Sequence, residues 1–371
     1  MSVLDRIGQK LLFSFDPETA HGLSIAALRC GLPVASSPTR DARRLPHDAR
    51  LKLSLCGLDF PNPLGMAAGY DKNAEVPDAL LGLGFGFAEV GTITPLAQTG
   101  NPKPRIFRLT ADDAVINRLG FNNEGHAAAE KRLAARKARG GIVGVNIGAN
   151  KDSTDRVSDY ERGVARFAPY ASYLTVNISS PNTPGLRNMQ AREQLGELLS
   201  RVMAARAAAP AQPPILLKIA PDLVEAELED IAAEVSEKNI DGIIVSNTTL
   251  SRAGLRSADL ANEAGGLSGK PLFERSTAVL ARMRKLLGPD MAIIGVGGVD
   301  STETALEKIR AGADLVQLYT GMIYAGPALP GRIVAGMAQF LHRENLNSIH
   351  ELRDSHVDQW LAKPLYQTTA A

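Results

Sequence analysis

Eight short apolar runs recur along this chain of 371 residues, and they limit its fold more than any other feature. Each run carries Gly, Asn, Thr or Ser near its C-terminal end. The runs occupy residues 63–69, 87–92, 142–148, 173–180, 215–221, 242–248, 292–298 and 314–321. Near-continuous apolar runs are typical of strands that are buried on both faces, as in a parallel sheet. Eight such strands with helix-like segments between them predict an α/β fold, a (β/α)8 TIM barrel.

A doubly wound parallel sheet is the alternative arrangement of such units. It is disfavoured because no GxGxxG motif joins the first strand to its helix, and GVGG at 295–298 comes late and lacks the later glycine. Helical patterns at 223–238 and 302–313 separate strands, and Asp222 and Glu225 resemble a capping box for the first of them.

Two insertions interrupt the repeat, and both are expected to form hairpins. The segment 51–60 would close the barrel floor, and the segment 105–117 has Ala-Asp-Asp at its turn. The second hairpin follows the C-terminal end of a strand, and long insertions at that position are commonly functional.

The chain divides into four parts. Residues 1–31 contain two amphipathic helical stretches, 3–15 and 17–30, with Asp16 before Pro17 as a helix N-cap signal. Residues 32–50 are polar and proline-rich and are interpreted as a linker. The barrel is expected over 51–345, and the tail 346–371 is expected to add one helix over 348–362.

Composition excludes several classes of protein. Hydrophobic residues make up 44% and charged residues 22%, which rules out a disordered or fibrous chain. The net charge of +1 lacks the basic excess typical of nucleic-acid binders. The two cysteines have no metal-binding spacing. No transmembrane stretch or secretory signal is evident, so we expect a cytosolic protein or one held on a membrane peripherally.

Polar residues collect where the predicted strands end, and barrel active sites lie at those ends. The set has two lysines, many amides, no histidine and a single carboxylate, Asp71. This composition argues against a metal hydrolase and against a glycosidase with paired carboxylates. A serine hydrolase is disfavoured because Ser180 has neither a GxSxG motif nor a nearby histidine.

The same residues suit a planar, carbonyl-rich anionic ligand. Lys218 lies inside the apolar run ILLKIAP, where a buried lysine needs a partner. The glycines that end strands seven and eight suit a phosphate, which barrels often bind there. A phosphate together with a lysine under a flat ring suggests FMN, and no metal is expected.

Long motifs in this sequence resemble the dihydroorotate dehydrogenase family, specifically its membrane-associated, quinone-reducing class. They are AAGYDKNAE (67–75), GTITP (91–95), NPKPRIFRL (101–109), INRLGFNNEG (116–125), VNIGANK (145–151), VNISSPNTPGLR (176–187), LKIAPD (217–222), SNTT (246–249), GGLSGKPL (265–272), IIGVGGV (293–299) and LVQLYTGMIY (315–324). The resemblance runs from the N-terminal helices to about residue 340.

The resemblance implies roles for individual positions. Those that would hold FMN are Ala68, Gly69, Tyr70, Asp71, Lys72, Thr92, Asn146, Asn177, Lys218, Ser246, Gly269, Gly298, Tyr319 and Thr320. Those that would hold dihydroorotate are Lys72, Asn117, Arg118, Leu119, Gly120, Phe121, Asn177, Asn182, Asn247 and Thr248. Ser180 would be the catalytic base.

The implied reaction is the oxidation of dihydroorotate to orotate in pyrimidine biosynthesis. Ser180 would remove a proton from C5 while C6 gives a hydride to N5 of FMN, and a membrane quinone would then accept the electrons. The N-terminal helices would form an apolar path to the flavin and hold the protein on the cytoplasmic face of the cell membrane.

Two other interpretations remain open from the sequence. A soluble, fumarate- or NAD-linked dihydroorotate dehydrogenase would have Cys at position 180 and no N-terminal extension, and neither applies here. A non-catalytic, flavin-binding barrel would be favoured by loss of Ser180 or Lys72, and both residues are present.

Overall fold

A closed barrel of eight parallel strands forms the centre of the computed structural model, which describes residues 12–31, 48–257 and 259–365. Around the barrel the order is β10-β12-β13-β3-β4-β7-β8-β9. The strands span Leu64–Met66 (β3), Phe87–Ile93 (β4), Ile142–Ile147 (β7), Tyr173–Asn177 (β8), Ile215–Ile219 (β9), Gly242–Val245 (β10), Ala292–Val296 (β12) and Leu315–Leu318 (β13). The predicted TIM barrel is confirmed, and closure excludes the doubly wound sheet.

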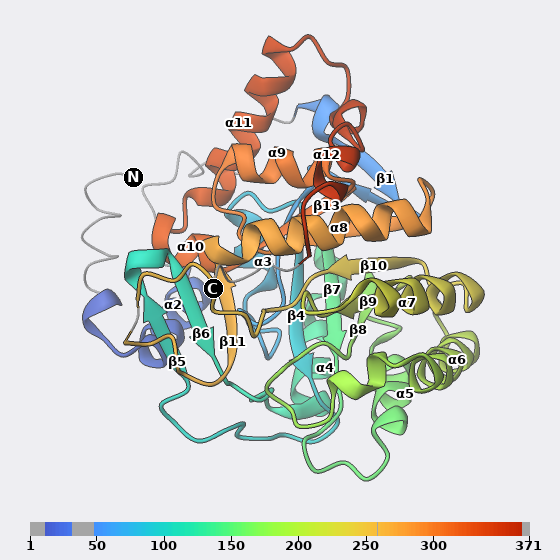
Figure 1. Cartoon of the computed structure of the whole chain (residues 1–371). Helices are drawn as coiled ribbons and strands as arrows, with labels where there is room; N and C mark the ends of the chain where they lie inside the picture. The colour runs from blue at the N-terminus through green and yellow to red at the C-terminus, as the bar shows by residue number, and fades with distance from the viewer. Residues whose placement is uncertain (1–11, 32–47, 258, 366–371) are drawn as a thin grey trace.

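Helices on the outside of the barrel cover the strands (Figure 1). They are α3 (Pro77–Gly82), α4 (Gly125–Arg136), α5 (Arg156–Phe167), α6 (Arg192–Ala208), α7 (Glu225–Glu237), α8 (Phe273–Leu287), α9 (Thr302–Arg310), α10 (Thr320–Ala325) and α11 (Leu329–Arg343). Every barrel strand is buried along nearly its whole length, as the apolar runs predict.

The capping box predicted at Asp222 and Glu225 is wrong. Helix α7 begins two residues later than predicted, with Val224 as N-cap and the Glu227 carboxylate accepting from the Val224 N–H at 2.8 Å. Asp222 instead accepts hydrogen bonds from Arg187 and from the Leu250 N–H, so it ties three loops together.

The floor of the barrel is closed by the predicted hairpin, β1 (Leu53–Leu55) and β2 (Leu58–Phe60), which pair antiparallel. Phe60 packs edge-on against Phe87, with ring centroids 5.3 Å apart. With Tyr173, Leu216, Ile244, Ile294 and Leu315, these rings fill the lower barrel. Side chains therefore fill the end of the barrel next to this hairpin, and the cavity lies at the other end, where the strands terminate.

The second predicted hairpin is also present, as β5 (Ile106–Leu109) and β6 (Ala114–Asn117). A third strand, β11 (Gly266–Gly269), pairs with β6, which the sequence did not predict. This small sheet lies beside helix α2 (Pro17–Arg29) at one end of the barrel (Figure 1). Together they roof the C-terminal ends of the strands.

Asp16 caps α2 as predicted, because its Oδ1 accepts from the N–H groups of Glu18 and Thr19. Residues 12–14 are also helical, and the rest of the first predicted helix lies outside the described residues, as does most of the linker. No described helix combines the length and apolar character that spanning a bilayer requires.

The tail forms two short helices rather than the single helix predicted. They are η8 (Ile349–Leu352) and α12 (Val357–Leu361), separated by a turn in which Asp354 has φ 71°. Trp360 is buried and donates to Glu307 of α9 at 2.7 Å, while its ring packs against Phe273 of α8. The tail therefore contacts both α8 and α9 on the outside of the barrel.

Candidate active site

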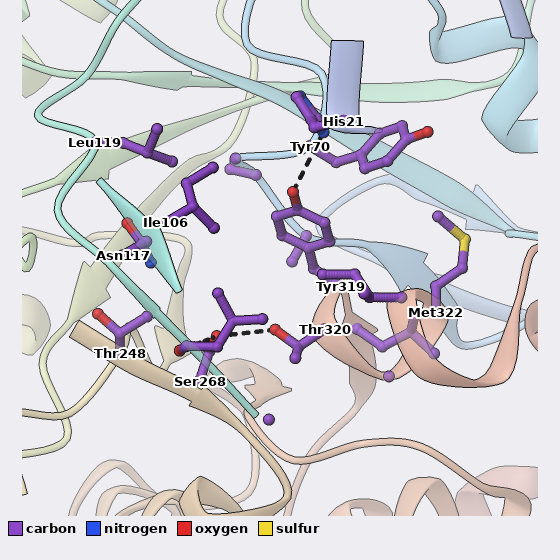
Figure 2. A pocket seen from close by; sticks show the side chains of 18 of the residues that line it. His21, Tyr70, Ile106, Asn117, Leu119, Thr248, Ser268, Tyr319, Thr320 and Met322 are labelled. Carbon is purple, nitrogen blue, oxygen red and sulfur yellow. Dashed lines mark hydrogen bonds between the residues drawn. The ribbon is translucent and has the colours of Figure 1, made fainter. Parts of the chain in front are cut away.

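A cavity of about 1240 Å³ occupies the C-terminal end of the barrel. Its walls include strand ends, the small sheet and α2 (Figure 2). The predicted site residues that line it are Ala68, Gly69, Tyr70, Lys72, Thr92, Asn117, Leu119, Gly120, Phe121, Asn177, Ser180, Asn182, Lys218, Ser246, Asn247, Thr248, Gly269, Gly298, Tyr319 and Thr320. The structure therefore brings nearly the whole predicted set to one place.

Three predicted residues do not line the cavity. The Asp71 carboxylate accepts from the N–H groups of Glu75 and Val76 at 2.8 Å, so it holds the loop after β3 rather than facing a ligand. Arg118 turns outward and pairs with Glu263 at 2.6 Å. Asn146 is fully buried, and its side chain bonds to other side chains inside the barrel. A cofactor role for their side chains would have to be indirect.

Two lysines reach the cavity from different strands without a protein partner. Lys218 lies on β9 level with Asn177 on β8, and Lys72 follows β3. Neither ammonium makes a hydrogen bond within the described part of the chain. Burial lowers the pKa of both, that of Lys72 to about 8, while Glu89 opposes this shift for Lys218. Such buried cations are suited to an anionic or carbonyl-rich ligand.

A further carboxylate, Glu89, lies inside the barrel; the prediction of Asp71 as the single carboxylate concerned the strand ends, and Glu89 is the third residue of β4. It lies on β4, is fully buried, and accepts from Asn146 at 2.8 Å, Gln317 at 2.9 Å and Tyr173 at 3.0 Å. The sequence signal was present, because Glu89 interrupts the apolar run FAEVGT just as Lys218 interrupts ILLKIAP.

A chain of hydrogen bonds leads from Glu89 to the cavity wall. Asn146 donates to Glu89, and its own Oδ1 accepts from Thr92 at 2.6 Å and from Asn177 at 3.1 Å. The Asn177 Oδ1 in turn accepts from Ser179 at 2.8 Å. Because a carboxylate with no proton can only accept, it fixes the orientation of each amide along the chain. The amides that face the cavity are therefore held in one orientation.

Ser180 lies just past the end of β8, is 5% exposed and lines the cavity. Its Oγ accepts from the Asn182 N–H at 3.2 Å, and the Asn182 side chain donates to Asn117 at 3.2 Å. Within the described residues, neither a carboxylate nor an imidazole bonds to this hydroxyl. This excludes a hydrolase triad at Ser180, whose hydroxyl lies instead beside the amides of Asn182 and Asn117.

A glycine turn after β12 leaves room at the opposite side of the cavity from these amides. Gly298 has φ 72°, and a Cβ placed there would lie 2.7 Å from the Phe273 nitrogen. A Cβ on Gly297 would lie 2.7 Å from the Ser276 Oγ. Only glycine allows this close packing of the turn on α8, and barrels commonly bind phosphate after strands seven and eight. A turn of this kind suits a phosphate group.

The third wall of the cavity is apolar and comes mainly from the N-terminal segment. The resemblance assigned the N-terminal helices an apolar path to the flavin without naming residues; those that line the cavity include Leu12, Phe13, Pro17, Ala20, Ala27 and Leu28, together with Met322 of α10. Their signal was the amphipathic pattern of 17–30, but which surface that apolar face covers depends on tertiary packing.

Helix α2 is fixed in place by polar contacts as well. His21 packs edge-on against Tyr70 at 5.2 Å between ring centroids, and its Nδ1 lies 3.4 Å from the Tyr319 hydroxyl (Figure 2). Burial, and then the charge of Lys72, lowers the pKa of His21 to about 3, so it is neutral. Arg105 makes two hydrogen bonds to Glu18, at 3.0 and 2.7 Å. These contacts hold α2 in place as one wall of the cavity.

Among residues 12–31, 48–257 and 259–365, no group of three or more His, Cys, Asp or Glu side chains is arranged to hold a metal ion.

Comparison with known proteins gives one consistent family. The family model "Dihydroorotate dehydrogenase" matches residues 50–341. A protein of Mesorhizobium japonicum named dihydroorotate dehydrogenase (quinone) is 84% identical over 98% of this chain and 100% of its own length. A protein of the same name from a Chelativorans species is 63% identical over 98% of this chain and 99% of its own. The crystal structure of the Eimeria tenella dihydroorotate dehydrogenase in complex with ferulenol superposes with a TM-score of 0.86 at 39% identity, covering 92% of this chain and 96% of that one.

Proposed function

This chain belongs to the dihydroorotate dehydrogenase family, and from that membership and the cavity we propose how it oxidises dihydroorotate to orotate with a quinone as electron acceptor. The reaction is a step of pyrimidine biosynthesis. The chain is an oxidoreductase, and its residues divide into those that hold a flavin, those that hold the substrate and those that admit the quinone.

We propose FMN as the resident cofactor. Lys218 and the amide of Asn177 would hold its ring, Asn146 would act indirectly by orienting Asn177, and the turn at Gly297 and Gly298 would hold its phosphate. When bound, FMN supplies the acceptor for the two electrons of the substrate and returns them to the quinone. What the protein contributes is orientation and charge: an ammonium and fixed amides beside the ring.

The substrate would lie at the polar end of the cavity. Lys72 would pair with its carboxylate, and the loop 117–121 with Asn182 and Asn247 would hold its ring carbonyls. Ser180 would take the proton from C5 of dihydroorotate. A serine hydroxyl is a weak base, so the site must also stabilise the negative charge that develops on the substrate, and Lys72 and the amides are placed to do so.

The apolar wall would admit the quinone. An amphipathic helix such as α2, with the stretch that precedes it, binds a membrane surface through its apolar face. We therefore propose that residues 1–31 hold the protein peripherally on the cytoplasmic face of the cell membrane and lead a membrane quinone to the flavin. The barrel domain, 51–345, would carry the oxidation of dihydroorotate.

One observation supports this assignment more than any other. Two lysines without hydrogen-bond acceptors in the described protein, the buried Lys218 and the partly buried Lys72, face the same cavity as Ser180. A buried cation without a partner is costly, so the cavity is built for a ligand that supplies acceptors at both positions.

The test is rapid reduction of the bound flavin by dihydroorotate without oxygen, followed at the flavin absorbance. The Ser180→Ala variant should retain FMN and orotate binding, while the rate of flavin reduction falls by about 10²- to 10⁴-fold, the usual contribution of general-base catalysis. Ser180→Cys should retain part of the rate, because a thiol also accepts a proton after ionisation.

The matched control is Ser200→Ala on the exposed face of α6, which should reduce at the wild-type rate. Flavin reduction at a near-wild-type rate in Ser180→Ala would refute the role of Ser180. A wild-type protein that releases no FMN on denaturation would refute the flavin assignment itself.

A further inference from the structure

A third lysine is buried in this protein, outside the cavity. Lys308 of α9 has no exposed surface, and its Nζ donates to the Ser276 Oγ at 2.6 Å and lies 5.1 Å from the centroid of the Phe273 ring. It has no ion-pair partner in the part of the chain that the structure describes. Burying a lysine with only a hydroxyl and an aromatic face around it costs free energy, which implies a compensating interaction.

The contacts of Lys308 lead directly to the glycine turn. The Ser276 Oγ, which accepts from Lys308, lies 3.2 Å from the carbonyl oxygen of Gly297 and can donate to it. Ser276 and Phe273 belong to the first turn of α8, against which Gly297 and Gly298 pack without room for a Cβ. Both glycines line the cavity. The ammonium therefore lies behind the turn, with one serine between them.

We propose that Lys308 is a positioning residue for the phosphate of the flavin, supplying a positive charge from behind the Gly297–Gly298 turn. The inference rests on the proposed function, since it requires FMN in the cavity. Between a buried ammonium and a phosphate on the other side of a packed turn there is little water to screen the attraction.

The distribution of charge supports this role. The cavity lysines, Lys72 and Lys218, are assigned to the substrate and the flavin ring, and neither lies on β12, β13 or the helices behind them. Burial alone shifts the pKa of Lys308, well below its usual value, and no carboxylate of the described residues opposes that shift. A phosphate anion would oppose it, and so would favour the charged ammonium.

The experiment compares FMN with riboflavin, which has the same ring without the phosphate. Flavin is removed from the full-length protein, and the dissociation constants of both ligands are measured by quenching of flavin fluorescence. In Lys308→Met the FMN constant should rise about tenfold, the effect of removing one positive charge behind the turn, while the riboflavin constant stays unchanged. Ser276→Ala, which keeps the charge, should change the FMN constant less.

The control is Lys285→Met, an exposed lysine on α8, which should bind both flavins as wild type does. Equal weakening of FMN and riboflavin by Lys308→Met would show a packing role only and overturn the proposal. Unchanged FMN binding would overturn it as well. If Lys308→Met does not fold, Lys308→Gln, which keeps a donor to Ser276 without the charge, gives the same comparison. Failure of the wild-type protein to bind FMN would instead refute the proposed function.

Discussion

Replacing Lys218 with methionine should separate flavin binding from folding. The side chain is 5% exposed, sits at the end of β9 and has no hydrogen-bond acceptor among the described residues. Methionine has a similar length and no charge, so it fills the same space and removes only the ammonium. A hydrogen bond to a charged group contributes about 1.5–3 kcal/mol, which predicts FMN binding about 10- to 150-fold weaker.

Folding without the flavin should change little. Loss of the sole partner of a buried ion costs about 3–5 kcal/mol, but Glu89 does not depend on Lys218. Its carboxylate keeps three neutral donors, Asn146, Tyr173 and Gln317. The variant also loses the cost of burying the ammonium. We therefore expect the free energy of unfolding of the flavin-free protein to change by less than about 1 kcal/mol.

Glu89→Leu should behave in the opposite way. It leaves Asn146 and Tyr173 as buried donors without an acceptor and Gln317 with only the Tyr173 hydroxyl at 3.4 Å, and each unsatisfied group costs about 1–3 kcal/mol. The flavin-free variant should therefore unfold at distinctly lower denaturant concentration, and it should bind flavin poorly because Asn146 and Asn177 lose their fixed orientation.

The assays are FMN content after purification, the FMN dissociation constant of the flavin-free protein, and urea unfolding without flavin. Lys285→Met is the control for loss of a lysine. Stoichiometric FMN at wild-type affinity in Lys218→Met would refute the assignment of Lys218 to the flavin. A flavin-free Lys218→Met that is destabilised as strongly as Glu89→Leu would show that the two residues form a structural ion pair instead.

Three further predictions concern other parts of the molecule. Orotate affinity should fall as pH rises through about 8, where Lys72 loses its proton, and should stay level below; Lys72→Met should abolish this dependence in a titration of orotate binding. Deleting residues 1–31 should leave flavin reduction by dihydroorotate intact and lower turnover with a long-tail quinone far more than with a small water-soluble acceptor; equal losses would contradict the quinone-access role. Trp360→Ala should destabilise the protein by about 3–5 kcal/mol in urea unfolding, because a buried indole and its bond to Glu307 are lost; an unchanged midpoint would show that the tail does not stabilise the barrel.

The barrel could be predicted from the sequence because its signal is local and repeated. Each strand is a short apolar run, and each run ends in the polar residues that the cavity uses. Lys218 followed from one physical argument, that a lysine within an apolar strand needs a partner. The same argument applies to Glu89 in the run FAEVGT, so the burial of this carboxylate was also predictable from the sequence.

Other features depend on contacts that no local pattern carries. The strand β11 is a glycine-rich segment that pairs with β6, about 150 residues earlier, because barrel closure brings them together. Lys308 lies in a helix with ordinary amphipathic spacing, where a lysine normally faces water. Its burial arises from the packing of α9 on α8. Asp222 has the sequence position of a helix cap, but its carboxylate accepts hydrogen bonds from Arg187 and Leu250 of distant loops.

The volume of the cavity and the chemistry of its walls explain why the N-terminal segment is part of the site. About 1240 Å³ exceeds the roughly 300–1,000 Å³ of a typical small-molecule pocket, so the space suits more than one ligand. The strand ends supply ammonium, amide and hydroxyl groups, which bind an anion, but an apolar quinone needs a dry surface. The strand ends offer little of such a surface: the register places Asn177 beside Lys218, and the apolar lining from the strands is limited to side chains such as Val296 and Leu318. Helix α2 adds that surface, and the Glu18–Arg105 pair and the His21–Tyr319 contact hold it against the barrel. In the proposed function the two half-reactions would use different walls of one cavity, and a segment from outside the barrel repeat, with Met322 of α10, supplies most of the apolar wall.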